Sequence, residues 1–135
     1  MFSQHEIQIL FRDLRSRFSC VFPWIRHSSL FFTSDPYASK TFQYRDMAYA
    51  VCEYFPQYIM LSTRILHFPF ENILGTLLHE MGHLADLSCY QPGTGKEQLA
   101  DDLAEYVTGY RIYYDGNDIQ TVTPARYPRP LYLHR

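Results

Sequence analysis

The chain has no long apolar run, only three cysteines and only two lysines. A membrane-spanning helix needs about 20 consecutive apolar residues, and no stretch here approaches that length. The cysteines are odd in number and have no C-x-x-C spacing, which fits reduced thiols in a cytosol. The first ten residues lack the basic start and apolar run of a secretion signal. These absences predict a cytoplasmic protein, either in the cell that makes it or in a host cytosol.

Excess charge of either sign is also missing. Twelve basic and 14 acidic residues give a formal net charge of −2, and the arginines are scattered along the chain. We therefore expect no nucleic-acid or membrane partner. Apolar residues make up 47% of the chain and aromatic residues 17%, which excludes a disordered protein. At 135 residues the chain is expected to form one domain with one core.

Apolar periodicity and turn residues divide the chain into short elements. Helices are expected over 5–18, 70–87 and 96–110, and strands over 29–33, 44–52 and 58–62. This order predicts an α+β fold in which a small mixed sheet packs on the 70–87 helix. The domain is assigned to residues 1–117. An extended tail containing Pro, Arg and Tyr is assigned to residues 118–135.

The 70–87 helix contains the motif His-Glu-Met-Gly-His at residues 79–83. His79 and His83 are one turn apart, so they share one face of the helix. Two neutral imidazoles at this spacing can bind Zn²⁺, and Glu80 can act as general base on a zinc-activated water. The alternative is a helix with two ordinary surface histidines. The strongly apolar helix disfavours it, because buried imidazoles and a carboxylate need partners that a metal and its water supply.

A catalytic zinc usually has three protein ligands, so a third is expected outside the motif. The candidates are Cys89, Asp86, His134 and Glu97. Cys89 occupies the last position of the longer H-E-x-x-H-x-x-G-x-x-H pattern, but Asp86 replaces its glycine. His134 lies in the predicted tail. Glu97 is preferred, and Asp86 is interpreted as a supporting group near the ligands.

The start of the 96–110 helix supports Glu97. Glu97 and Asp101 are four residues apart and can point the same way. Ala100 and Ala104 are small enough to let this helix approach the motif helix closely. Glu97 would ligate zinc, and Asp101 would accept the free ring N–H of one histidine. Alternatively, Glu97 is a carboxylate favoured at a helix start, and Asp101 is solvated.

The H-E-x-x-H motif, followed by a helix with Glu97-x-x-Ala100-Asp101, resembles the gluzincin peptidases. Thermolysin-like, lethal-factor-like and ImmA/IrrE-like peptidases share this plan. Residues 59–62 and 77–81 are also similar to SprT-like proteases, which use a third histidine that this chain lacks at a comparable place. The resemblance covers about residues 44–108. It implies a zincin-like fold, Zn²⁺ as cofactor and a peptide or protein substrate.

The sequence thus predicts a zinc metallopeptidase, an endopeptidase rather than an exopeptidase, with Glu80 passing a proton to the leaving amine. Residues 58–62 could form the edge strand that aligns substrate. Tyr90, in the loop between the two helices, is the expected donor to the oxyanion. The alternative donors are Tyr110, Tyr113, Tyr114, His27 and His67.

Two other functions stay open. The chain could be a zinc-containing binding or regulatory module without turnover, docking through Arg126-Tyr127-Pro128-Arg129-Pro130. It could also be a latent protease whose tail blocks the cleft. Glu80 favours an enzyme, because a purely structural zinc site needs no base.

Overall fold

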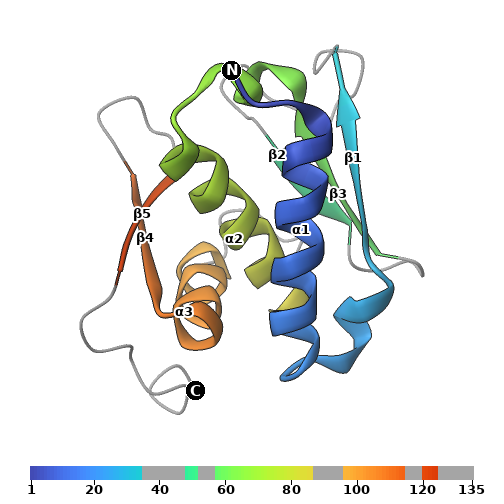
Figure 1. Cartoon of the computed structure of the whole chain (residues 1–135). Helices are drawn as coiled ribbons and strands as arrows, with labels where there is room; N and C mark the ends of the chain where they lie inside the picture. The colour runs from blue at the N-terminus through green and yellow to red at the C-terminus, as the bar shows by residue number, and fades with distance from the viewer. Residues whose placement is uncertain (35–47, 52–56, 87–95, 115–119, 125–135) are drawn as a thin grey trace.

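A computed structural model describes residues 1–34, 48–51, 57–86, 96–114 and 120–124 (Figure 1). Six elements occur where the sequence predicts them: α1 (Gln4–Ser19), β1 (Ser29–Thr33), β2 (Ala48–Val51), β3 (Tyr58–Ser62), α2 (Phe70–Asp86) and α3 (Lys96–Thr108). Four further elements are not predicted: the short 3-10 helices η1 (Pro23–His27) and η3 (Thr63–His67), and the strands β4 (Tyr110–Tyr114) and β5 (Gln120–Pro124). The mixture of helices and two small sheets confirms the α+β class.

The first sheet has the strand order β1-β3-β2. β1 runs parallel to β3, with Ser29 opposite Tyr58, and β2 runs antiparallel to it, with Ala48 opposite Leu61. The expectation that residues 58–62 form an edge strand is therefore wrong. Ile59 and Leu61 are fully buried, so the most apolar strand takes the centre of the sheet. Among the described strands, β2 lies at the edge and packs against α2.

A second, two-stranded sheet follows α3. Gly109 has a φ of 78°, and its N–H donates to the Glu105 carbonyl at 2.7 Å. This left-handed residue ends α3 and turns the chain into β4. β4 pairs antiparallel with β5, placing Tyr114 opposite Gln120. β5 begins beyond the predicted domain boundary at residue 117, so regular structure continues to Pro124. Residues 125–135 of the predicted tail lie outside the described part of the chain.

Helix α1 begins with a capping box. The Glu6 N–H donates to the Ser3 hydroxyl at 3.1 Å, and the Ser3 N–H donates to the Glu6 carboxylate at 3.0 Å. Ile7, Phe11 and Phe18 form the buried face of the helix, and this face packs on α2. The predicted helical stripe is thereby confirmed.

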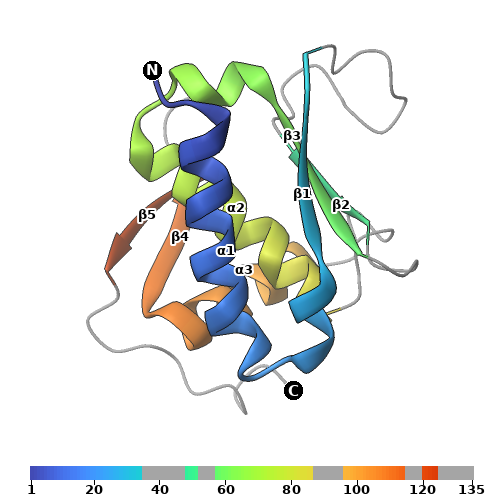
Figure 2. The same ribbon diagram turned by 45° about the vertical axis from the view of Figure 1, so that its right-hand side comes forward.

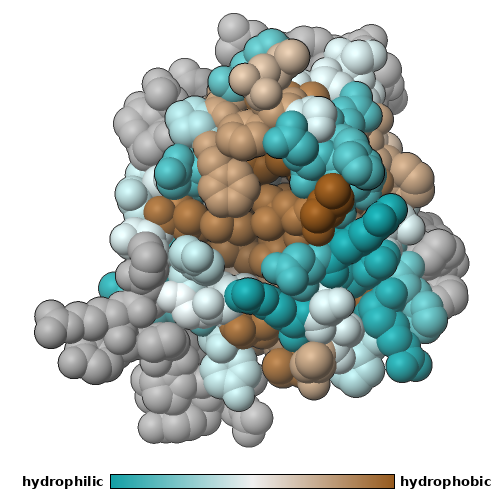
Figure 3. All heavy atoms as spheres, viewed as in Figure 1, coloured by the Kyte–Doolittle hydropathy of each residue, from teal (hydrophilic) through white to brown (hydrophobic). Residues whose placement is uncertain are grey.

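Helix α2 lies in the middle of the molecule. Figures 1 and 2 place it between the three-stranded sheet and the β4–β5 hairpin, with α1 across one side. All residues from 72 to 85 are buried. Apolar side chains gather on the face shown in Figure 3, over α2 and the adjoining side of α1. Within the described residues, no helix combines the length and apolar character that crossing a membrane requires.

Candidate metal centre

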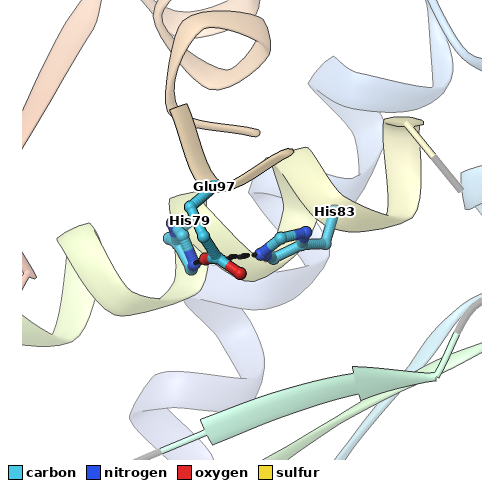
Figure 4. Close-up of side chains that lie close together, drawn as sticks. All are labelled: His79, His83 and Glu97. Carbon is cyan, nitrogen blue, oxygen red and sulfur yellow. Dashed lines mark hydrogen bonds and ion pairs between the residues drawn. The ribbon is translucent and has the colours of Figure 1, made fainter. Parts of the chain in front are cut away.

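The motif histidines come from successive turns of α2, and their rings converge on the Glu97 carboxylate (Figure 4). Their side chains are only 4% and 7% exposed. The rings meet edge to face, with centroids 4.6 Å apart, and the two Nε2 atoms are 3.0 Å apart. His79 and His83 therefore share one face of α2, as the sequence predicts, and this face is buried.

Glu97, near the start of α3, completes a group of three. Its Oε2 lies 2.7 Å from His79 Nε2 and 3.0 Å from His83 Nε2. The three residues offer ligand atoms that all lie within 4.8 Å of one another. The Glu97 side chain is 45% exposed, so the group is closed by α2 and open to solvent beside α3.

A glycine of the motif itself permits this meeting of helices. A Cβ on Gly82 would lie 2.0 Å from the Ala100 carbonyl oxygen, so α2 and α3 cross with backbone against backbone. Ala100 and Ala104 are both fully buried. The predicted close approach through small residues is confirmed on the α3 side. The role of Gly82 is not predicted, because H-E-x-x-H leaves that position free.

Asp101 contacts His79 at Nδ1, the ring nitrogen that does not face Glu97. Its Oδ1 lies 2.7 Å from His79 Nδ1, and the carboxylate is 8% exposed. A carboxylate only accepts hydrogen bonds, so Nδ1 carries the hydrogen and donates it. In a neutral His79 ring the Nε2 lone pair then faces Glu97. The contact between Asp101 and a motif histidine occurs as the sequence predicts.

A lone pair facing a carboxylate at 2.7 Å is repulsive unless a positive charge lies between them. Burial disfavours a charge on His79, but the hydrogen bonds to Asp101 and Glu97 outweigh it and raise the His79 pKa to about 10. The hydrogen bonds from His79 and His83 hold the pKa of Glu97 well below its usual range. Both shifts have the same physical origin: the carboxylates around His79 favour a positive charge between the ring and Glu97.

The donor set fits a divalent metal ion. In a tetrahedral site with bonds of about 2.0–2.1 Å, neighbouring ligand atoms lie about 3.3 Å apart. The observed separations of 2.7 to 3.0 Å differ from this by a few tenths of an ångström. Two imidazole nitrogens and one carboxylate oxygen suit several first-row divalent metals. The group can therefore hold a metal ion, whose identity the geometry leaves open.

The other predicted site residues have different outcomes. Glu80 is 7% exposed, and its charge contributes to the raised pKa of His79, which places it near that ring. The Asp86 Oδ2 is buried and has no hydrogen-bond partner within the described part of the chain, so its supporting role stays a prediction. Tyr90, Cys89 and His134 lie outside the described residues.

The β4–β5 hairpin borders the site, which the sequence does not predict. The Asn72 side chain donates to the Gln120 carbonyl at 3.0 Å, and the Thr76 hydroxyl donates to Gln120 Oε1 at 3.4 Å. Partial burial, followed by the charges of Asp101 and Glu97, raises the Tyr114 pKa to about 12. A hairpin signal is visible in retrospect, because a turn-forming Asp-Gly-Asn-Asp run separates two segments rich in β-branched and aromatic residues.

The arrangement thus joins a buried His–His pair, a half-exposed carboxylate and a supporting aspartate across two helices. No protein-family model matches the chain, and no curated protein or solved structure matches it.

Proposed function

We propose that the protein is a zinc-dependent metallopeptidase of zincin-like fold that cleaves peptide bonds within a chain. The observation that carries this proposal is the convergence of His79 Nε2, His83 Nε2 and Glu97 Oε2 within 3.0 Å, beside the buried Glu80. Three ligands leave one position of a tetrahedral zinc open, as catalytic zinc sites require. A site that only bound metal would have no use for a further carboxylate, that of Glu80, beside its ligands.

Each residue then has a chemical task. A bound zinc ion supplies Lewis acidity, which polarises the scissile carbonyl and makes water a better nucleophile. Glu80 accepts the proton of the attacking water and returns it to the leaving amine. Asp101 holds the His79 hydrogen on Nδ1 and so keeps Nε2 available as a ligand.

The edge strand β2 is the element that would align the substrate. It pairs with β3 on one side, and α2, which carries the motif, packs against it. The strands of this sheet run below the three side chains in Figure 4. An extended peptide added to β2 would form main-chain hydrogen bonds and would bring a peptide bond toward His79 and His83.

The decisive experiment compares wild type with Glu80→Gln on a library of peptides blocked at both termini. Cleavage is followed by mass spectrometry, and zinc content by elemental analysis. We expect Glu80→Gln to keep its zinc and to lose about 100- to 10,000-fold in cleavage rate, the usual range for a general base. Glu71→Gln, at an exposed position in the first turn of the same helix, is the matched control and should cleave like wild type.

Two outcomes would contradict the proposal. Cleavage by Glu80→Gln at the wild-type rate would remove Glu80 from the mechanism. A wild type that binds zinc and cuts no peptide would favour the binding or regulatory module instead. The ligand set is tested separately with Glu97→Ala, whose zinc affinity should fall. An unchanged affinity would reject Glu97 as a ligand.

A further inference from the structure

The β4–β5 hairpin is fixed to the helix that carries the motif. A Cβ on Gly75 would lie 2.9 Å from backbone atoms of Gln120 and Thr121, so β5 rests directly on the backbone of α2. Asn72 and Thr76 hydrogen-bond Gln120 on either side of that contact. Thr76 is one turn before Glu80. The hairpin therefore has a fixed position beside the general base.

Alternation along β4 determines which tyrosine faces inward. Ile112 is buried in the core, while Arg111 and Tyr113 on the other face are exposed. Because side chains two residues apart share a face, Tyr114 is on the inward side with Ile112. Tyr114 is still 46% exposed, since β4 ends at this residue. Its ring can therefore border the site and also be reached by a substrate.

The electrostatic surroundings of Tyr114 link it to the site. Partial burial raises its pKa, and the charges of Asp101, Glu97 and Glu80 raise it further, whereas a hydrogen bond from Gln120 acts against them. The pairing of the hairpin gives the same placement, because Tyr114 lies opposite Gln120, whose side chain accepts a hydrogen bond from Thr76 one turn before Glu80. Tyr114 therefore keeps its hydrogen over the working range of most enzymes and acts as a hydrogen-bond donor.

We propose that Tyr114 is a catalytic residue, whose phenolic O–H donates a hydrogen bond to the oxyanion that develops on the scissile carbonyl. This role rests on the proposed peptidase function. The site needs such a donor, because three carboxylates surround the histidines and none of them can donate when ionised. Tyr114 takes this task in place of Tyr90, which the sequence favoured.

Tyr114→Phe tests the proposal, with Tyr113→Phe as the matched control on the exposed face of the same strand. Two quantities are measured on the zinc-loaded proteins. The first is kcat for a cleaved peptide. The second is the affinity for a capped tetra-alanine in which a phosphinate replaces the central amide, measured by calorimetry. The phosphinate oxygens occupy the place of the oxyanion without any turnover.

We expect Tyr114→Phe to lower kcat about 100-fold with little change in KM, and to weaken phosphinate binding about 10- to 100-fold. Zinc affinity should stay unchanged, and Tyr113→Phe should match wild type within about twofold in every measurement. An undiminished kcat or phosphinate affinity in Tyr114→Phe would overturn the role of Tyr114 and leave the peptidase proposal intact. A wild type that neither cleaves peptides nor binds the phosphinate would overturn both.

Discussion

Asp101 determines which nitrogen of His79 faces the proposed metal. With the hydrogen held on Nδ1 by a 2.7 Å contact, Nε2 points at Glu97 as a lone pair. Without that acceptor, the ring could place its hydrogen on Nε2 and lose its capacity to bind metal. Carboxylates that support a ligating histidine in this way raise its basicity and fix its orientation.

Asp101→Asn should therefore weaken zinc binding about 10- to 100-fold, measured by competition with a chromogenic chelator. Asp102→Asn is the matched control, because Asp102 is the next residue of α3, is equally buried and accepts a hydrogen bond from Gln98 at 2.9 Å instead. We expect the control to bind zinc like wild type. Equal losses in the two variants would show that Asp101 acts only through the stability of α3.

Helical spacing explains why so much of the site could be predicted. His79, Glu80 and His83 follow from one motif, and Glu97 with Asp101 from a second spacing of four residues. Both patterns are local, so the backbone geometry of a helix is enough to place the side chains. Tyr114 could be named only as one of several donors, because its position depends on how a hairpin packs against a helix far away in the sequence.

Two glycines of α2 lie where this helix contacts two different neighbours. Gly82 meets Ala100 of α3, which carries Glu97, whereas Gly75 meets Gln120 and Thr121 of the hairpin. In both places backbone lies against backbone, so an added methyl group has no flexible side chain to displace. The neighbouring element as a whole must move.

Gly82→Ala and Gly75→Ala are predicted to have different effects. Each should destabilise the fold by about 1–3 kcal/mol through overpacking, measured by urea denaturation. Gly82→Ala should also weaken zinc binding on the order of tenfold, because it pushes α3 and Glu97 away. Gly75→Ala should keep its zinc affinity and lose cleavage activity, because the hairpin carries Tyr114 and no proposed ligand. Equal zinc affinities in the two variants would contradict this separation.

The elements themselves were predicted unevenly, for physical reasons. α1 and α2 have long apolar stripes, and β1 and β3 have short apolar runs bounded by turn residues. The centre position of β3 could not be read locally, because strand order depends on pairing between distant segments. β5 is not predicted because proline and arginine beyond residue 123 make the segment from residue 118 resemble a tail, and β4 overlaps the end of the predicted 96–110 helix at Tyr110. Their pairing with each other, and the packing of β5 on α2, stabilise them.

The molecule as a whole should respond to pH through the same group of residues. His79 has a pKa raised from 6.5 to about 10, so in the metal-free protein its contribution to stability is complete below pH 6.5. That contribution is lost as the pH rises through about 10. The lowered pKa of Glu97 acts in the opposite direction, since its contribution is present above pH 4.5 and is lost as the pH falls. His79 and Glu97 together therefore stabilise the metal-free fold most between pH 4.5 and pH 6.5.

Zinc cancels the His79 dependence above pH 6.5, because it must displace the proton of His79 before it can bind. Its affinity should rise about tenfold per pH unit between pH 6.5 and 8.5, which corresponds to about 1.4 kcal/mol per unit. Since the proposed zinc ion would join α2 to α3 only in the folded state, the difference in Tm between zinc-loaded and chelator-treated protein should widen by about 4 °C per pH unit. Scanning calorimetry at a fixed free zinc concentration measures this Tm difference at each pH. His79→Gln should show no such widening, and a constant difference in the wild type would mean that His79 releases no proton when zinc binds.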